Sequence, residues 1–112
     1  MNAVPADPSP AGDPFDALGN PQRRTIVAML ASRPRSVQEL ADELPISRPA
    51  VSRHLRLLSA AGLVSDEQVG TRRLYRLQER GLDAVRGYLE DVWGTAAGRF
   101  RLFAENTGRK EP

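Results

Sequence analysis

Cysteine is absent from the 112 residues of the sequence, and histidine occurs once. The absence of cysteine excludes disulfides and thiolate metal ligands, and one histidine without a partner makes a poor transition-metal site. No apolar run approaches the roughly 18 residues of a membrane-spanning helix. No basic segment precedes an apolar one near Met1, so we expect no signal peptide. The sequence therefore predicts a cytoplasmic protein without a metal or a cofactor.

Acidic residues are outnumbered in the middle of the chain. Residues 20–80 carry eleven arginines against six acids, although the net charge of the whole chain is only +2. Basic charge concentrated in one region is typical of proteins that bind a polyanion, and an arginine-rich surface that merely faces solvent is the alternative. The sequence offers no nucleophile–base pair, no convergent carboxylates and no glycine-rich phosphate loop, so we expect a protein that is not an enzyme.

Apolar periodicity and capping residues predict one mainly α domain over residues 15–106, with aperiodic and disordered tails at 1–14 and 107–112. Ser36 and Glu39 have the spacing of a capping box, and Ser47 is a good N-cap. Gly62 and Gly70 can adopt the left-handed conformation that ends a helix or makes a turn. The expected elements, in the order α-α-α-α-β-β-α, are a short apolar turn at Phe15–Leu18, helices at Arg23–Ala31, Ser36–Leu44 and Ser47–Ala61, strands at Leu63–Gln68 and Arg72–Leu77, and a helix at Leu82–Ala104.

The segment Ser47–Ala61 has two contrasting faces. Val51, Leu55 and Leu58 recur at helical spacing, with Gly62 next in the series, which indicates a buried stripe. The segment contains no acid, and two short helices joined by a tight turn can place the second one in the major groove of DNA. Arginine can pair with guanine, and serine and arginine can both hold phosphates. The residues of the polar face that we expect to contact DNA are Ser47, Arg48, Pro49, Ser52, Arg53 and Arg56, with Arg56 on phosphate rather than on a base.

Two further groups of residues join this predicted DNA surface. His54 lies beside the buried stripe and either packs there or hydrogen-bonds to a phosphate. The predicted hairpin carries basic residues just after its tip, which can follow the phosphates or enter the minor groove, although charge that protects an edge strand is the alternative. We call this predicted hairpin, from Leu63 to Leu77, the wing. Its residues that we expect to contact DNA are Thr71, Arg72, Arg73 and Arg76.

These motifs resemble the ArsR (ArsR/SmtB-type) winged-helix repressors. The resemblance lies in Ser47-Arg-Pro-Ala-Val-Ser-Arg-His-Leu-Arg-Leu-Leu58, in Ala61-Gly-Leu-Val64 and in Gly70-Thr-Arg-Arg-Leu-Tyr75, and it covers roughly residues 15–105. It implies a winged helix-turn-helix homodimer that binds a palindromic operator in double-stranded DNA and represses transcription, often of its own operon. Metal-sensing members carry a cysteine pair where this chain has Glu39-Leu-Ala-Asp-Glu-Leu44, so the resemblance is to the non-metal branch.

The last predicted helix is more apolar than one small domain can bury. Its apolar residues recur at three- and four-residue spacing, with Trp93 beside them. We therefore expect an isologous dimer through this helix and Phe15–Leu18, although a core helix within one chain is the alternative. The expected dimer residues are Phe15, Leu18, Leu82, Val85, Leu89, Val92, Trp93, Ala96, Phe100 and Phe103.

Two other functions remain open at the level of the sequence. A winged helix can serve protein contact or bind DNA without sequence choice, and the arginines on both the helix and the wing argue against protein contact alone. A small apolar pocket near Trp93 could receive an effector, but the sequence does not identify the effector, the operator or the regulated genes.

Overall fold

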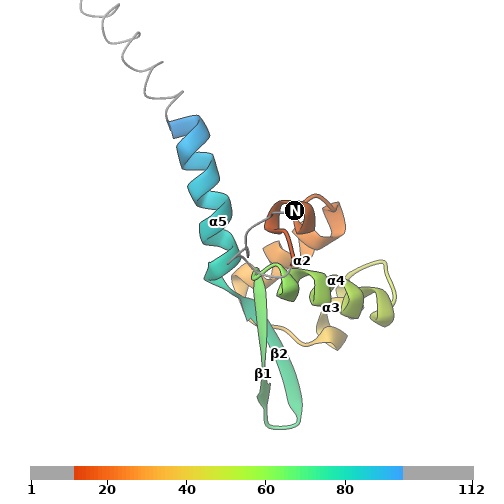
Figure 1. The fold of residues 1–112 in the computed structure, drawn as a ribbon. Helices are drawn as coiled ribbons and strands as arrows, with labels where there is room; N and C mark the ends of the chain where they lie inside the picture. Colours follow the sequence, from red (N-terminus) through yellow and green to blue (C-terminus); the bar gives the residue numbers. More distant parts are fainter. Residues whose placement is uncertain (1–11, 95–112) are drawn as a thin grey trace, which may run out of the picture. The chain divides into compact units, whose positions relative to one another are not determined.

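The computed structural model describes residues 12–94, and a boundary between two compact units falls after Leu82. The predicted order of four helices, a hairpin and a further helix is confirmed (Figure 1). Most of the expected tails, residues 1–11 and 107–112, lie outside the described residues. The elements are α1 (Pro14–Ala17), α2 (Pro21–Ser32), α3 (Val37–Glu43), α4 (Arg48–Ala60), β1 (Val64–Val69), β2 (Arg72–Leu77), α5 (Glu79–Leu89) and a π-helical turn, η1 (Glu90–Gly94).

The sequence predicts that the folded domain begins at Phe15, but the structure shows that it begins earlier in the chain. The carboxylate of Asp13 accepts a hydrogen bond from the N–H of Phe15 at 2.9 Å, and Pro14 is buried at the first position of α1. A proline suits this position because its φ is already helical and its missing N–H would have no partner there. The N–H of Gly12 also donates to the carbonyl of Ala60 at 2.8 Å. Pro14 is therefore the first residue of α1 and does not belong to the disordered tail that was predicted for residues 1–14.

The core lies among α2, α3, α4 and the start of β1, and the buried stripe predicted for α4 is confirmed. Burial of a large aliphatic side chain contributes about 1.5–3 kcal/mol, so these residues hold α4 against the domain in one rotation. Its polar face is left exposed as a result. The largest fully buried side chains are Ile26, Leu40, Val51, Leu55 and Leu58.

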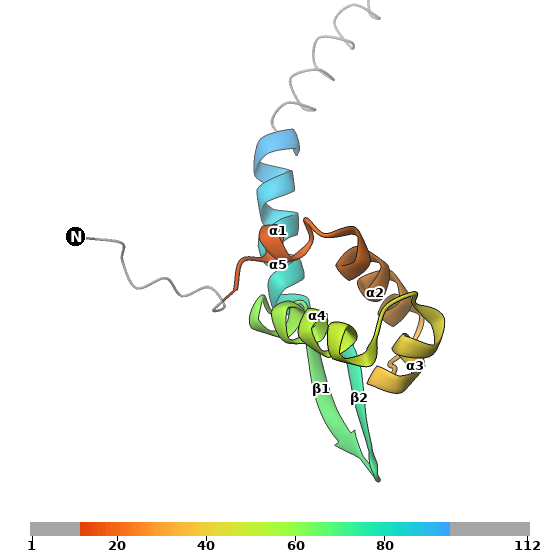
Figure 2. The same ribbon diagram turned by 90° about the vertical axis from the view of Figure 1, so that its right-hand side faces the viewer.

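The helices α3 and α4 form the helix-turn-helix (Figure 2). Each of them begins at an N-cap serine. The hydroxyl of Ser36 accepts from the N–H of Glu39 at 3.2 Å, and the Glu39 carboxylate accepts from the N–H of Ser36 at 2.9 Å. The predicted capping box is thus present. The Ser47 hydroxyl accepts from the N–H of Ala50 at 3.3 Å and caps α4, as its sequence predicts. Each cap satisfies N–H groups that have no partner within the helix.

The wing is an antiparallel hairpin in which Val64 pairs with Leu77 and Val69 with Arg72. A two-residue loop joins the strands, and Gly70 adopts the positive φ of 63° that such a loop requires. Tyr75 exchanges two backbone hydrogen bonds with Arg35, of 3.0 and 2.8 Å, on the other edge of β2. The hairpin is therefore tied to the segment that leads into α3.

The last helix begins at Glu79, three residues earlier than the predicted Leu82. Gly81 lies inside α5, where its N–H donates to the carbonyl of Gly62 at 2.7 Å. A Cβ on Gly81 would lie 2.5 Å from the carbonyl oxygen of Ala61, so no larger residue fits this close approach. Residues 95–104 of the predicted helix lie outside the described residues. Among residues 12–94, the structure contains no helix that is long and apolar enough to span a membrane.

Candidate nucleic-acid interface

The first turns of α4 present the predicted polar face to solvent. Ser47, Arg48, Pro49 and Arg53 are exposed, and Ser52 is half-buried. Burial of the opposite stripe forces this orientation, because residues three and four positions apart share one face of a helix. The turns closest to the helix N-terminus are those that reach base edges in a helix-turn-helix.

Three guanidinium groups of α4 have no acidic partner in the part of the chain that the structure describes. Among residues 12–94, Arg48, Arg53 and Arg56 make no ion pair, and all three are exposed. A guanidinium that is not engaged within the protein keeps its five N–H donors for a base edge or a phosphate. The basic face of α4 can therefore bind an anion without first breaking an internal contact.

The predicted wing arginines are exposed, but each of them is paired with an acid. Arg76 lies 2.8 Å from a carboxylate oxygen of Glu67 in β1, and Arg73 pairs with Asp66 in the same strand. Arg72 reaches out of the hairpin to Glu39 of α3, at 2.8 Å. Thr71, in the turn between the strands, is exposed. The wing thus differs from α4, because its positive charge is compensated within the protein.

A cleft of about 320 Å³ lies where the wing meets the beginnings of α3 and α4. It brings Arg48 of α4 together with two arginines of the wing. The sequence did not identify the contribution of α3, because the first residues of that helix carry no charge. The residues that line the cleft are Ser36, Val37, Gln38, Arg48, Arg72 and Arg73.

His54 belongs to the core and not to the exposed face of α4. The residue is only 8% exposed, its Nε2 lies 3.1 Å from Oε1 of Gln22, and its Nδ1 lies 3.4 Å from a guanidinium nitrogen of Arg23. Because Arg23 can only donate, Nδ1 is the acceptor and Nε2 carries the proton that goes to Gln22. Burial, with the positive charges of Arg23 and Arg53, lowers the pKa of His54. Of the two roles expected for this residue, the structure favours packing, so we remove His54 from the DNA-contacting set.

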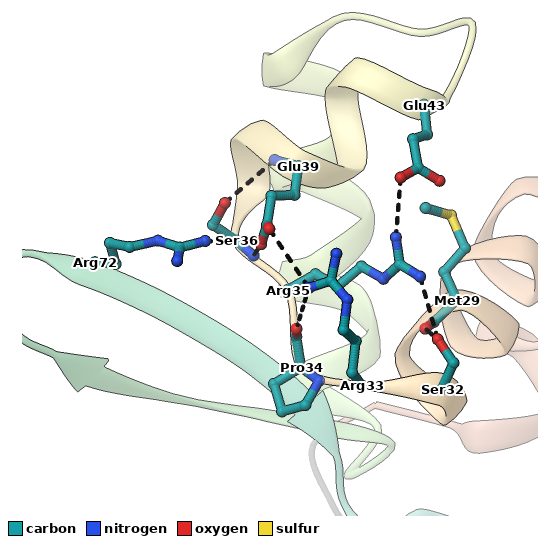
Figure 3. A network of polar contacts seen from close by, with 9 residues as sticks. All are labelled: Met29, Ser32, Arg33, Pro34, Arg35, Ser36, Glu39, Glu43 and Arg72. Atoms are coloured by element: carbon teal, nitrogen blue, oxygen red, sulfur yellow. Dashed lines mark hydrogen bonds and ion pairs between the residues drawn. The ribbon is translucent and has the colours of Figure 1, made fainter.

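Two arginines that were not predicted as site residues form ion pairs with acids of α3. Arg35 is nearly buried and pairs with Glu43 at 3.1 Å, while Arg33 pairs with Glu39 at 3.4 Å (Figure 3). The Ser36 N–H, with the nearby Arg72 and Arg33, lowers the pKa of Glu39 despite the opposing effect of desolvation. Arg33 and Arg35 follow α2 without periodicity, so only the tertiary contacts reveal their positions.

The residues predicted for a dimer interface are apolar and mostly exposed. Phe15, Leu82, Leu89, Val92 and Trp93 are exposed, with Trp93 the most open of these at 57%. Leu18 and Val85 are partly buried, and Tyr88 packs edge-to-face on Trp93 with ring centroids 6.3 Å apart. Ala96, Phe100 and Phe103 lie outside the described residues.

An apolar pocket of about 270 Å³ lies in the first unit. Trp93, near which the sequence left an effector pocket open as an alternative, is not among its lining residues. Within residues 12–94, no group of three or more histidine, cysteine or acidic side chains is arranged to hold a metal ion. The pocket is lined by Leu18, Val27, Leu63, Leu77, Gln78, Glu79 and Leu82.

A helix-turn-helix followed by a two-stranded wing defines the class of winged helix-turn-helix DNA-binding proteins. The family model described as bacterial regulatory protein, arsR family, matches residues 20–66. The HTH-type transcriptional regulator Rv2034 of Mycobacterium tuberculosis is 45% identical over 94 residues, which cover 84% of this chain and 88% of that protein. The chain belongs to the ArsR family, and it is a DNA-binding transcriptional regulator and not an enzyme.

Two further similar proteins also come from species of Mycobacterium. The HTH-type transcriptional repressor SmtB of Mycobacterium tuberculosis is 44% identical over 87 residues, which cover 73% of this chain and 64% of that protein. The solution structure of the homodimeric winged helix-turn-helix DNA-binding domain of Mb0332 from Mycobacterium bovis superposes with a TM-score of 0.57 at 30% identity. That match covers 76% of this chain and 75% of the other.

Proposed function

We propose that the protein is a homodimeric repressor that binds an inverted-repeat operator in double-stranded DNA, including one upstream of its own gene. The reading helix α4 lies in the major groove, with Arg48, Ser52 and Arg53 at base edges. Arg56 and the wing hold the flanking phosphates. Occupation of the operator then blocks transcription.

The observation that carries this proposal is the exposed face of α4, which contains no acid and whose three arginines make no ion pair within residues 12–94. The solvent-exposed face of an ordinary helix carries both acidic and basic residues. Several unpaired guanidinium groups on one face repel one another, and a bound anion relieves this repulsion. Arg53 is one helical turn after Pro49, so it can lie in the groove when the helix start does.

The dimer is supported by the exposed apolar residues of α5 and η1. Leu89, Val92 and Trp93 are exposed within five residues of one another in the sequence. Monomeric proteins rarely expose large groups of apolar side chains, and such groups often mark an interface. The homodimeric state named for the Mb0332 domain agrees with this assignment. Two reading helices about one turn of DNA apart would then engage successive major grooves.

The test is a mobility-shift titration with the DNA immediately upstream of the gene and with a scrambled duplex of the same composition. Arg53→Ala should weaken binding to the upstream DNA by about 1–3 kcal/mol, or roughly 5- to 150-fold, and should weaken binding to the scrambled duplex much less. Arg80→Ala is the matched control, because Arg80 is an exposed arginine of α5 that makes no ion pair with another described residue, and it should change both affinities equally and slightly.

Two results would contradict parts of this proposal. An equal loss on both duplexes would make Arg53 a phosphate contact and remove its reading role. Equal affinity of the unaltered protein for both duplexes at physiological salt would favour architectural binding without sequence choice over an operator.

A further inference from the structure

The carboxylate of Glu39 lies between the helix-turn-helix and the wing. Its Oε1 accepts the Ser36 N–H at 2.9 Å and lies 2.8 Å from a guanidinium nitrogen of Arg72. Its Oε2 accepts from Arg33 at 3.4 Å (Figure 3). One carboxylate thus caps α3 and neutralises two arginines, of which one belongs to the wing.

The pair between Arg72 and Glu39 differs from the other ion pairs of the wing. The two remaining wing arginines pair with acids of β1, so those pairs stay intact when the hairpin moves. Arg72 instead uses an acid outside the hairpin, and its side chain is 55% exposed. It also lines the cleft that contains Arg48 and Arg73. Arg72 can therefore rotate between an internal acid and an anion in that cleft.

We propose that the cleft between the wing and the beginnings of α3 and α4 receives a phosphate of the DNA backbone, and that Arg72 exchanges Glu39 for this phosphate when DNA binds. This inference rests on the proposed function. In the absence of DNA, the Glu39 carboxylate pairs with Arg72 of the wing. It therefore competes with the phosphate and lowers the affinity of the protein for DNA.

The exchange leaves no buried charge without a partner. An exposed ion pair contributes little to stability, so Arg72 gives up little when it leaves Glu39. The Glu39 carboxylate keeps the Ser36 N–H and Arg33. Duplex DNA carries one negative charge for about every 1.7 Å of its axis, so a phosphate near the cleft attracts Arg72 more strongly than one carboxylate does.

The substitution Glu39→Gln separates this role from helix capping. A glutamine at the same position can still accept the Ser36 N–H and complete the capping box, but it carries no charge. The matched control is Glu43→Gln, because it removes the same charge from the same helix at a residue that pairs with Arg35 and not with the wing. Circular dichroism of both variants checks that α3 remains folded.

Because a phosphate contact does not depend on sequence, the probe is a fluorescent mixed-sequence duplex of about 30 base pairs, titrated at several salt concentrations. Glu39→Gln should bind about two- to fivefold more tightly than Glu43→Gln, and its log–log salt slope should be more negative by up to about 0.9. In an Arg72→Ala background, this advantage should disappear.

The outcomes separate the exchange from the function on which it rests. A protein that binds neither this duplex nor the upstream DNA would overturn the proposed function. DNA binding in which Glu39→Gln equals or falls below Glu43→Gln would overturn the exchange alone. An advantage that persists unchanged without Arg72 would do the same, because Glu39 would then act by general repulsion.

Discussion

The His54 imidazole connects the reading helix to the beginning of α2. Its two ring nitrogens contact Gln22 and Arg23, and the guanidinium of Arg23 also donates to the carbonyl of Ala17 at 2.7 Å. A chain of hydrogen bonds therefore runs from the end of α1 through Arg23 to α4. Its geometry requires a neutral imidazole, because a protonated ring would present a donor to the donor of Arg23.

This arrangement predicts a loss of stability in weak acid. The pKa of His54 is lowered in the folded state by burial and by Arg23 and Arg53, whereas the unfolded chain keeps the usual value of 6.5. Below pH 6.5 the unfolded state therefore binds more protons than the folded state, so stability is full above that pH and falls as the pH drops through the lower folded value. Urea unfolding at pH 7.5 and 5.5 measures the loss.

The control for this prediction is His54→Leu, which fills a similar volume and cannot titrate. Other groups that titrate in this range affect both proteins, so the variant should show a smaller decrease in unfolding free energy between the two pH values. An identical decrease in both proteins would show that His54 does not contribute. The variant should also be less stable at pH 7.5, by about 1 kcal/mol for each hydrogen bond lost.

Residues whose partners are near in sequence were predictable, and residues with distant partners were not. The Ser36 capping box, the Ser47 cap and the stripe through Leu55 depend on spacings of three or four residues, which the sequence displays directly. The partner of His54 lies 32 residues away, and Arg72 pairs with an acid of a different element. Packing of the core brings such distant residues together, so their partners cannot be predicted from sequence spacing alone.

At the scale of the elements, the junction between the wing and α5 shows why the start of the last helix was misplaced. Helix propensity disfavours glycine by about 1 kcal/mol relative to alanine, so the sequence favoured a start after Gly81. The structure instead uses Gly81 within the first turn of α5, because the backbone of Gly62 passes too close for a side chain. Packing requirements at this position outweigh the propensity of a single residue.

Two glycine-to-alanine substitutions in α5 should therefore have opposite effects. Gly81→Ala should destabilise the protein by about 1–3 kcal/mol, because its Cβ would overlap the carbonyl of Ala61. Gly87→Ala should stabilise it by up to about 1 kcal/mol, because, apart from the adjacent residues and the backbone of its own helix turns, no described atom lies within 4 Å of the new methyl group. Urea unfolding at one fixed protein concentration measures both effects. Stabilisation by both substitutions would mean that the approach of Gly62 is not tight in solution.

At the scale of the whole molecule, the wing and the reading helix form one half of the proposed reader. A single helix-turn-helix covers one half-site, and tight binding to an inverted repeat requires a second copy held at a fixed distance. In an isologous dimer each interface residue occurs twice, so one substitution removes two contacts. In the proposed dimer, the affinity for an operator therefore depends on the apolar residues of α5 and η1.

Val92 and Val69 provide a matched pair for testing this dimer, because they are 43% and 45% exposed and only Val92 belongs to the proposed interface. Truncation to alanine removes about two methylene equivalents from each protomer, at about 0.8 kcal/mol apiece when buried. Val92→Ala should therefore raise the dimer dissociation constant by about ten- to a hundredfold, whereas Val69→Ala, on the wing, should leave it unchanged. Sedimentation equilibrium from nanomolar to micromolar concentration measures the constant. A monomeric unaltered protein at micromolar concentration, or equal behaviour of the two variants, would contradict the dimer and with it the paired reading of an inverted repeat.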